Sequence, residues 1–205
     1  AALSGRRDYY RGLGNYLKYV EVGNSWRGKR VFVRFYGANS VTNLMVNGRH
    51  AGEHRGGDNA FVFEVTDYVE YGRKNLFWVT VNNAARVDVL PTAGDGNAYG
   101  GIFRKVELIV AEPCLIGLDS TRSDGVRLAA TTMNADKAAG NVFIKLNVPA
   151  GKAVQTEVKI TDSSGEIVFE GSVRHKADKP FAEVKVPFEV KKPALWGGVG
   201  NAPLY

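Results

Sequence analysis

Val41-Thr42-Asn43-Leu44-Met45-Val46-Asn47-Gly48 joins a strand-like run to a turn signal. The run belongs to a series of short segments in which apolar and polar residues alternate with a period of about two, as in strands with one face in a core. Asn and Gly both tolerate the positive φ angles of a type I′ turn. We therefore expect a tight β-hairpin at Asn47-Gly48.

Similar segments fill the first half of the chain, separated by turn signals such as Gly23-Asn24 and Gly56-Gly57. A single helical turn is expected from Thr66 to Tyr71, where Thr66 or Asp67 would cap it. Many short strands at this spacing predict an all-β fold, either a sandwich or a jelly roll. The expected strands are 16–22, 31–35, 41–46, 61–65, 76–81 and 102–110.

A second β domain is expected after Ala111-Glu112-Pro113, because proline lacks the donor N–H and interrupts strands. We place the boundary so that the domains are residues 1–111 and 112–205. The size of the second half suits an immunoglobulin-like sandwich, and its turns predict consecutive antiparallel strands in its middle. The expected strands are 126–132, 142–148, 154–161, 167–173 and 181–186.

Composition narrows the class of partner. The 205 residues are 44% hydrophobic, enough for a sizeable core, and carry a formal net charge of +6. Lysines and arginines are scattered through the strand patterns, so no nucleic-acid partner is expected. No apolar run is long enough to cross a bilayer, so no membrane partner is expected either. The chain starts without Met or a signal peptide, and we expect it to be a piece of a longer protein.

No metal site and no cofactor are expected. Cys114 is the single cysteine and forms neither an internal disulfide nor a multi-thiolate zinc site, so we expect a small buried hydrophobe. His50 and His54 stand four residues apart, but the glycines around them argue against a helix that would place both on one face.

Three motifs follow one another in the first half, and a fourth closes the chain. The first runs from Val46-Asn47-Gly48 to His54-Arg55-Gly56-Gly57; the others are Phe61-Val62-Phe63-Glu64-Val65-Thr66 and Gly100-Gly101-Ile102-Phe103-Arg104. In order and spacing they resemble the N-terminal sugar-binding domain of glycoside hydrolase family 2, the β-galactosidase family. Pro193-Ala194-Leu195-Trp196 and Pro203-Leu204-Tyr205 resemble the close of that family's second domain.

The resemblance implies a galactose-binding-like jelly roll followed by an immunoglobulin-like sandwich. It also implies a retaining exo-glycosidase, whose reaction needs two carboxyl groups about 5–5.5 Å apart. Both catalytic glutamates would lie in a C-terminal barrel that this chain lacks, so we expect the fragment alone to be inactive. For the complete protein a β-galactosidase is expected ahead of a β-glucuronidase or a β-mannosidase.

The same resemblance supplies the expected partners: a carbohydrate, namely a β-galactoside or related glycan, the catalytic barrel of the same polypeptide, and further copies in a homo-oligomer. It favours a periplasmic or secreted bacterial protein. Two alternatives stay open. One is a free-standing carbohydrate-binding module, which needs an exposed aromatic platform; the other is a structural pair of sandwiches without a sugar role.

A candidate substrate-binding residue follows from the family motif, which places an Asp six residues ahead of the second Gly of Gly100-Gly101. That residue is Asp95. A carboxylate there accepts hydrogen bonds from sugar hydroxyls and orients the ring without being catalytic. The alternative is that Asp95 only shapes the turn with Gly96. Asn97 and Tyr99 are further candidates, and Tyr99 serves either as a sugar platform or in packing.

Other singled-out residues carry structural expectations, and no catalytic residue is expected in the chain. Gly56-Gly57 should permit a backbone conformation or a close approach that a side chain would block. Arg104 is expected to form a structural ion pair, and Trp196 to anchor the end of the second domain. The polar segment 7–12 is expected to be exposed and to line the same cleft as Asp95.

Overall fold

A computed structural model describes residues 10–57, 59–89, 100–118 and 125–197. Within these ranges the chain is built of β-strands, with one short 3-10 helix, η1 (Asn24–Trp26), and no α-helix. The all-β prediction is confirmed. None of the described elements is a helix long and apolar enough to cross a membrane. The described residues fall into two compact units, which divide between Glu112 and Pro113.

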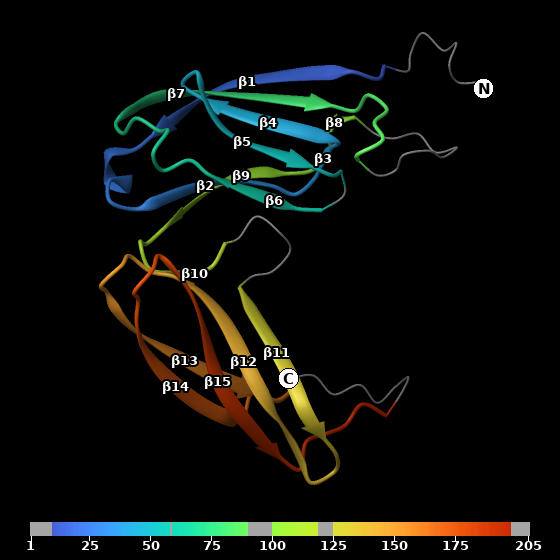
Figure 1. Ribbon diagram of the computed structural model, residues 1–205, viewed down its shortest axis with the longest axis vertical. Helices are drawn as coiled ribbons and strands as arrows, with labels where there is room; N and C mark the ends of the chain where they lie inside the picture. The colour runs from blue at the N-terminus through green and yellow to red at the C-terminus, as the bar shows by residue number, and fades with distance from the viewer. Residues whose placement is uncertain (1–9, 58, 90–99, 119–124, 198–205) are drawn as a thin grey trace, which may run out of the picture. The chain divides into compact units, whose positions relative to one another are not determined.

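The first unit is a sandwich of two antiparallel sheets (Figure 1). Its strands are β1 (Leu13–Val22), β2 (Arg30–Phe35), β3 (Ala38–Asn39), β4 (Val41–Val46), β5 (Arg49–Arg55), β6 (Phe61–Glu64), β7 (Arg73–Asn82), β8 (Gly101–Ile102) and β9 (Val106–Ala111). One sheet has the order β1-β7-β4-β5 and the other β6-β2-β9, while β3 and β8 form a short pair.

The core between the two sheets is built by alternate residues of each strand. Phe35 on β2 and Phe61 on β6 stack with ring centroids 4.9 Å apart, and Phe63 meets both rings edge-on. Leu44 and Val46 of β4 face them and are fully buried. Burying each such side chain contributes about 1.5–3 kcal/mol, so the inward faces of the two sheets hold the unit together.

The hairpin predicted at Asn47-Gly48 is confirmed between β4 and β5, since both residues have positive φ angles of 51° and 78°. Its asparagine is also tied into the fold. Asn47 Nδ2 donates to Asn75 Oδ1 at 2.7 Å, and Asn47 Oδ1 accepts from the Leu76 amide at 3.0 Å. Asn75 is itself fully buried, so the turn is locked to the start of β7.

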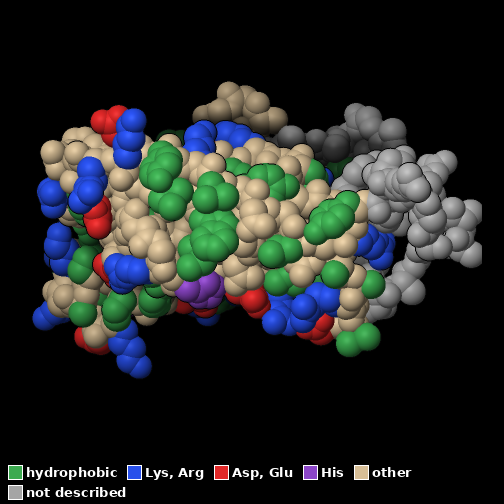
Figure 2. Space-filling view, turned by 90° about the horizontal axis from the view of Figure 1, so that it is seen from above, with side chains coloured by type: hydrophobic (Ala, Val, Ile, Leu, Met, Phe, Trp, Pro, Cys, Tyr) green, Lys and Arg blue, Asp and Glu red, His purple; other side chains and the backbone are tan. Residues whose placement is uncertain are grey.

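The outer face of the larger sheet carries apolar side chains (Figure 2). Leu17 and Tyr19 of β1 are 64% and 69% exposed, and Trp78 of β7 is 36% exposed. Apolar area of this kind on the outer face of a sheet marks a candidate contact surface.

The second unit is also a sandwich (Figure 1). Its strands are β10 (Leu115–Ile116), β11 (Val126–Met133), β12 (Lys137–Asn147), β13 (Ala153–Thr161), β14 (Ile167–Lys176) and β15 (Phe181–Lys191). β12 pairs with β10, β11 and β15, and β13 and β14 form a separate hairpin. Side chains from both layers share one core, and the partly buried Cys114 packs against it.

Two strand predictions are wrong in their pairing or extent. Residues 102–110 form two strands rather than one, because the chain leaves β8 at Phe103 and re-enters a sheet at Val106. The Phe103 ring lies where a side chain on Gly37 would be, and the Tyr36 amide donates to the Lys105 carbonyl at 2.9 Å. In the second unit β12 pairs with β15 instead of β13, since the chain crosses to the other layer after residue 147.

The helical turn expected from Thr66 to Tyr71 is present only as hydrogen-bonded turns, in which the Tyr68 and Val69 amides donate to the Val65 carbonyl. Thr66 does not cap it. Its Oγ1 accepts from the Val31 amide at 3.0 Å and donates to Glu64 at 2.8 Å, so it joins β2 to the end of β6.

Candidate functional site

The predicted substrate-binding residues Asp95, Asn97 and Tyr99 lie outside the described residues, and their roles stay predictions. The described chain stops at Val89 and resumes at Gly100. Polar side chains and glycines surround Gly100 and form what we call the frame of the candidate site. The contacts of these residues are described below.

Asn83, just after β7, lies at the centre of the frame and is 8% exposed. Its Oδ1 accepts from the Gly12 amide at 2.8 Å, and the backbone N–H of Asn83 donates to the Gly12 carbonyl at 3.2 Å. A Cβ on Gly100 would overlap the Asn83 side-chain amide. Glycine is therefore required at residue 100 because the backbone runs directly against Asn83.

Gly101, the second glycine of the motif, has a φ of +82°, and the Tyr16 hydroxyl occupies the space that its Cβ would need. The same hydroxyl accepts from the Ile102 amide at 3.3 Å. Tyr16 of β1 thus fixes the start of β8, and the two glycines allow the chain to pass between Asn83 and Tyr16.

The opposite side of the frame comes from β3 and from Gly56-Gly57. Asn39 pairs with Gly101, and the Ser40 hydroxyl and amide both donate to the Asn82 carbonyl, at 3.0 and 3.2 Å. The Gly56 amide donates to the Ser40 carbonyl at 2.8 Å. Gly56 has a φ of +129°, and a Cβ on Gly57 would lie 2.6 Å from Asn39 Oδ1. The predicted need for both glycines is confirmed.

A charged cluster lies next to the frame, and one of its members, Asp88, stands two residues before the undescribed segment begins. Arg55 forms ion pairs with Glu53 at 2.8 Å and with Asp88, and Arg86 pairs with Asp88 at 2.8 Å. The hydrogen bond from Arg86 holds the pKa of Asp88 below its usual range, and the hydrogen bond from Arg55 does the same for Glu53. A general acid must keep its proton near neutral pH. These carboxylates are therefore suited to structural ion pairs rather than to protonating a leaving group.

The two neighbouring histidines of β5 have different surroundings. His54 stacks on Phe61 with ring centroids 3.9 Å apart, and burial lowers its pKa. His50 is exposed, and its Nε2 lies 3.0 Å from Asn43 Oδ1. A register shift in β5 separates them, since His54 is paired with buried Thr42 and His50 with Met45. Within the described residues no three His, Cys, Asp or Glu side chains form a group that could hold a metal ion.

The ion pair expected for Arg104 and the cleft expected beside segment 7–12 stay predictions. Gly12, the described end of segment 7–12, contacts the frame through Asn83, and Tyr10 is 71% exposed. Arg104 lies over the Phe103 ring and donates to the Tyr36 carbonyl at 3.5 Å, so its described contacts are structural.

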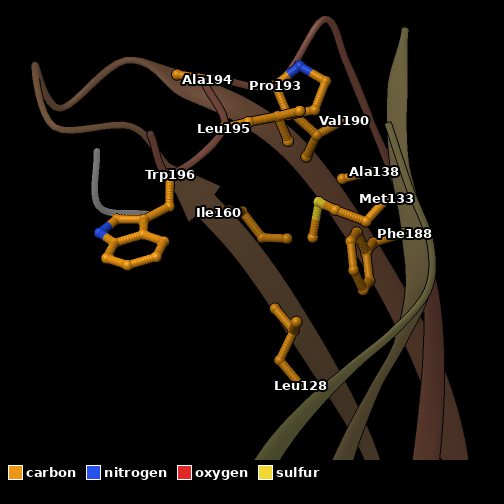
Figure 3. A pocket seen from close by; sticks show the side chains of 10 residues that line it. All are labelled: Leu128, Met133, Ala138, Ile160, Phe188, Val190, Pro193, Ala194, Leu195 and Trp196. Carbon is orange, nitrogen blue, oxygen red and sulfur yellow. The ribbon is translucent and has the colours of Figure 1, made fainter. Parts of the chain in front are cut away.

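Trp196 differs from its prediction as an anchor, because the residue is 72% exposed. It forms one wall of an apolar pocket of about 470 Å³ in the second unit (Figure 3). Leu128, Met133 and Phe188 line the same hollow. The side chains that face it are apolar, so the pocket offers packing area rather than groups for sugar chemistry.

The sequence reasoning missed Asn83, Tyr16 and Ser40, which carry most of the hydrogen bonds of the frame. The available signal was weak. Asn82-Asn83 follows an apolar strand as many turn residues do, and nothing local shows that the second amide faces a glycine seventeen residues further along the chain.

Comparisons with known proteins agree with this geometry. Residues 6–112 match the family described as "Glycosyl hydrolases family 2, sugar binding domain". A β-glucuronidase from Bacteroides fragilis is 39% identical over the whole chain, and a β-galactosidase from Thermoanaerobacter pseudethanolicus is 30% identical over 77% of it. A crystal structure of a Bacteroides fragilis protein matches 92% of the chain with a TM-score of 0.87 and 33% identity.

The chain spans only part of each of these proteins: 30% of the β-glucuronidase, 22% of the β-galactosidase and 29% of the crystallised chain. The family match covers more than half of the chain and includes all of the frame residues from Gly12 to Gly101. It also contains the three motifs that carried the resemblance. The chain belongs to glycoside hydrolase family 2.

Proposed function

We propose that the chain is the non-catalytic N-terminal part of a retaining exo-glycosidase that hydrolyses terminal O-glycosidic bonds. The observation that carries the proposal is the match of residues 6–112 to the sugar-binding domain of a glycosidase family. The two curated relatives described above are named as glycosidases, and the chain spans less than a third of each. The reacting carboxyl groups then belong to the rest of the polypeptide.

In this proposal residues 1–111 are the sugar-binding jelly roll and residues 112–205 the immunoglobulin-like domain. The division of the described residues between Glu112 and Pro113 supports that boundary. Both domains support the catalytic barrel of the same polypeptide, and the enzyme works as a homo-oligomer.

We further propose that Asp95 hydrogen-bonds a hydroxyl of the substrate sugar, with Asn97 and Tyr99 beside it. What supports this is the frame at the end of the segment, where Asn83 and Tyr16 fix Gly100-Gly101 by direct contact. A sugar hydroxyl is oriented only by a group whose own position is defined, and Gly100-Gly101 is a fixed point of the chain close in sequence to Asp95.

The substrate is proposed to be a terminal β-galactoside, and a β-glucuronide is the second candidate. The first follows from the family resemblance and from the β-galactosidase relative. The second is favoured by the relative that is 39% identical over the whole chain and is named a β-glucuronidase. The two sugars differ at C4, where the configuration of the hydroxyl is inverted, and at C6, where a glucuronide carries a carboxylate, so a substrate panel separates them.

The test assays the complete polypeptide that contains this chain against aryl β-galactoside, β-glucuronide and β-mannoside. We expect one of the first two to be cleaved with retention of configuration. Asp95→Ala should lower kcat/KM by about 10- to 100-fold, because it removes a charge-assisted hydrogen bond to the substrate. Asp162→Ala is the matched control, since Asp162 shapes a turn in the second unit by accepting from the Ser164 and Glu166 amides.

Each outcome decides between the readings. If the polypeptide cleaves none of the substrates but binds sugar, the carbohydrate-binding module replaces the glycosidase. If Asp95→Ala is as active as Asp162→Ala, Asp95 only shapes its turn and the proposed binding role is lost.

A further inference from the structure

The outer face of the sheet β1-β7-β4-β5 carries two adjacent rows of side chains with different chemistry. The strand register sets both rows, and each crosses all four strands. One row is mainly apolar and runs through Leu17, Trp78, Met45 and His50. The row beside it is polar and runs through Asn15, Thr80, Asn43 and Glu53.

The indole in the apolar row is held in one orientation. Trp78 Nε1 donates to Asn15 Oδ1 at 3.0 Å, which ties the ring to the polar row. Trp78 is 36% exposed, and Leu17 and Tyr19 beside it on β1 are more exposed still. A fixed and partly exposed indole is pre-organised for stacking and loses little entropy when a ligand covers it.

The polar row retains hydrogen-bonding capacity toward solvent. Asn15 is exposed and Thr80 is partly exposed, so the Asn15 side-chain nitrogen and the Thr80 hydroxyl are open to water. Asn43 orients its neighbours, since its Oδ1 lies 3.0 Å from His50 Nε2. Glu53 is a carboxylate that pairs with Arg55 at 2.8 Å, and the hydrogen bond from Arg55 lowers its pKa. The row therefore offers donors in its middle and an acceptor at one end.

We propose that this surface, defined by the two rows and called the Trp78 face, binds a neutral glycan chain. A pyranose ring presents an apolar face of C–H groups and a rim of hydroxyls, and the two rows present an aromatic stripe beside a hydrogen-bonding stripe. Strands lie about 4.8 Å apart, so four strands span roughly 14 Å. That length suits several linked sugars rather than one ring.

Two other occupants fit the Trp78 face less well. A second copy of the chain would bury the Asn15 and Thr80 donors, which then need partners or cost free energy as unsatisfied groups. The two rows contain no lysine or arginine to pair with the carboxylates of an acidic glycan, and the neighbouring Arg55 is already paired with Glu53 and Asp88. Figure 2 shows hydrophobic and uncharged side chains over the middle of this face, with lysines and arginines mainly toward its margins. The inference involves none of Asp95, Asn97 or Tyr99 and does not depend on the proposed glycosidase activity.

The test is affinity gel electrophoresis of the 205-residue chain in gels that contain soluble β-1,4-galactan, mixed-linkage β-glucan, galactomannan or xylan. We expect at least one of these neutral polysaccharides to retard the chain. Trp78→Ala should weaken that binding about tenfold or more, as truncation of a central tryptophan does at other interfaces. Leu17→Ser, at an exposed position of an edge strand, should weaken it without threatening the fold.

Trp196→Ala is the matched control, because it removes a highly exposed tryptophan from the second unit and should leave binding unchanged. Polygalacturonate controls for charge, since the chain is basic and any such binding should fade with salt and ignore Trp78→Ala. The proposal is overturned if no neutral polysaccharide retards the chain, or if Trp78→Ala and Leu17→Ser both bind as the wild type does. It is equally overturned if sedimentation shows a dimer that dissociates in the Trp78→Ala variant but does not dissociate when sugars are added.

Discussion

Adding one methyl group at Gly101 tests how tightly the frame of the candidate site is packed. Its φ of +82° disfavours any side chain, and the Tyr16 hydroxyl already fills the place of a Cβ. Gly101→Ala should therefore lower the free energy of unfolding by about 2–4 kcal/mol, from backbone strain and overpacking together. Urea unfolding of the chain measures this change.

Gly28→Ala is the control for that substitution, because Gly28 has nearly the same φ of +80° but nothing within 4 Å of its Cβ position. Strain alone should cost about 1–2 kcal/mol there. Equal losses at the two positions would mean that Tyr16 yields easily, and the frame would then be looser than its contacts indicate.

At the scale of elements, a pair of side chains ties β6 to β2. Arg30 donates to both carboxylate oxygens of Glu64, at 2.9 and 2.6 Å. Burial acts to raise the pKa of Glu64, but the hydrogen bonds from Arg30 and Thr66 outweigh it, so the folded-state pKa lies below its usual value of 4.5. The folded state thus binds the proton more weakly than the unfolded state does.

This linkage gives a pH prediction for the two sheet strands. Stability from Glu64 is fully present above pH 4.5 and is lost as the pH falls through the lower folded-state pKa. Glu64→Gln should cost about 1 kcal/mol at pH 7, a modest figure because the Glu64 side chain is 40% exposed and solvent screens it. In unfolding experiments from pH 7 to pH 3, the difference from wild type should shrink below pH 4.5.

Glu170→Gln serves as the comparison, since Glu170 pairs with Lys159 at 3.0 Å and is 57% exposed. Its effect should stay near zero across the range. A Glu64→Gln difference that stays constant down to pH 3 would contradict the assignment of the pKa shift to the folded state.

How far the sequence predicts these elements depends on whether the information is local. Asn47-Gly48 was predictable because both residues must have positive φ in the turn that they form. The break between β8 and β9 was not, because it depends on the Phe103 ring packing against Gly37, a residue distant in sequence. The pairing of β12 with β15 likewise depends on how two layers close over one core. The same reason hid Asn83 and Tyr16, whose polar groups meet Gly100 and Gly101 only after the sheets have formed.

At the scale of the whole molecule, each unit has a buried core of its own, as an independently folding domain does. Retaining hydrolysis needs a nucleophilic carboxylate and a protonated carboxyl group about 5–5.5 Å from it. The carboxylates next to the site frame are held by arginines with lowered pKa values, so none of them is suited to be the acid.

We therefore expect the purified 205-residue chain to be folded but inactive on aryl β-galactoside and β-glucuronide. Circular dichroism typical of β-sheet and a cooperative unfolding transition check the first part, and product release at high protein concentration checks the second. The complete polypeptide in the same assay is the positive control. Hydrolysis by the chain alone that survives further purification and disappears in a variant of one of its own carboxylates would place the reacting groups within these residues. The proposal that catalysis belongs to the barrel would then fail, whereas sugar binding at the Trp78 face would be unaffected.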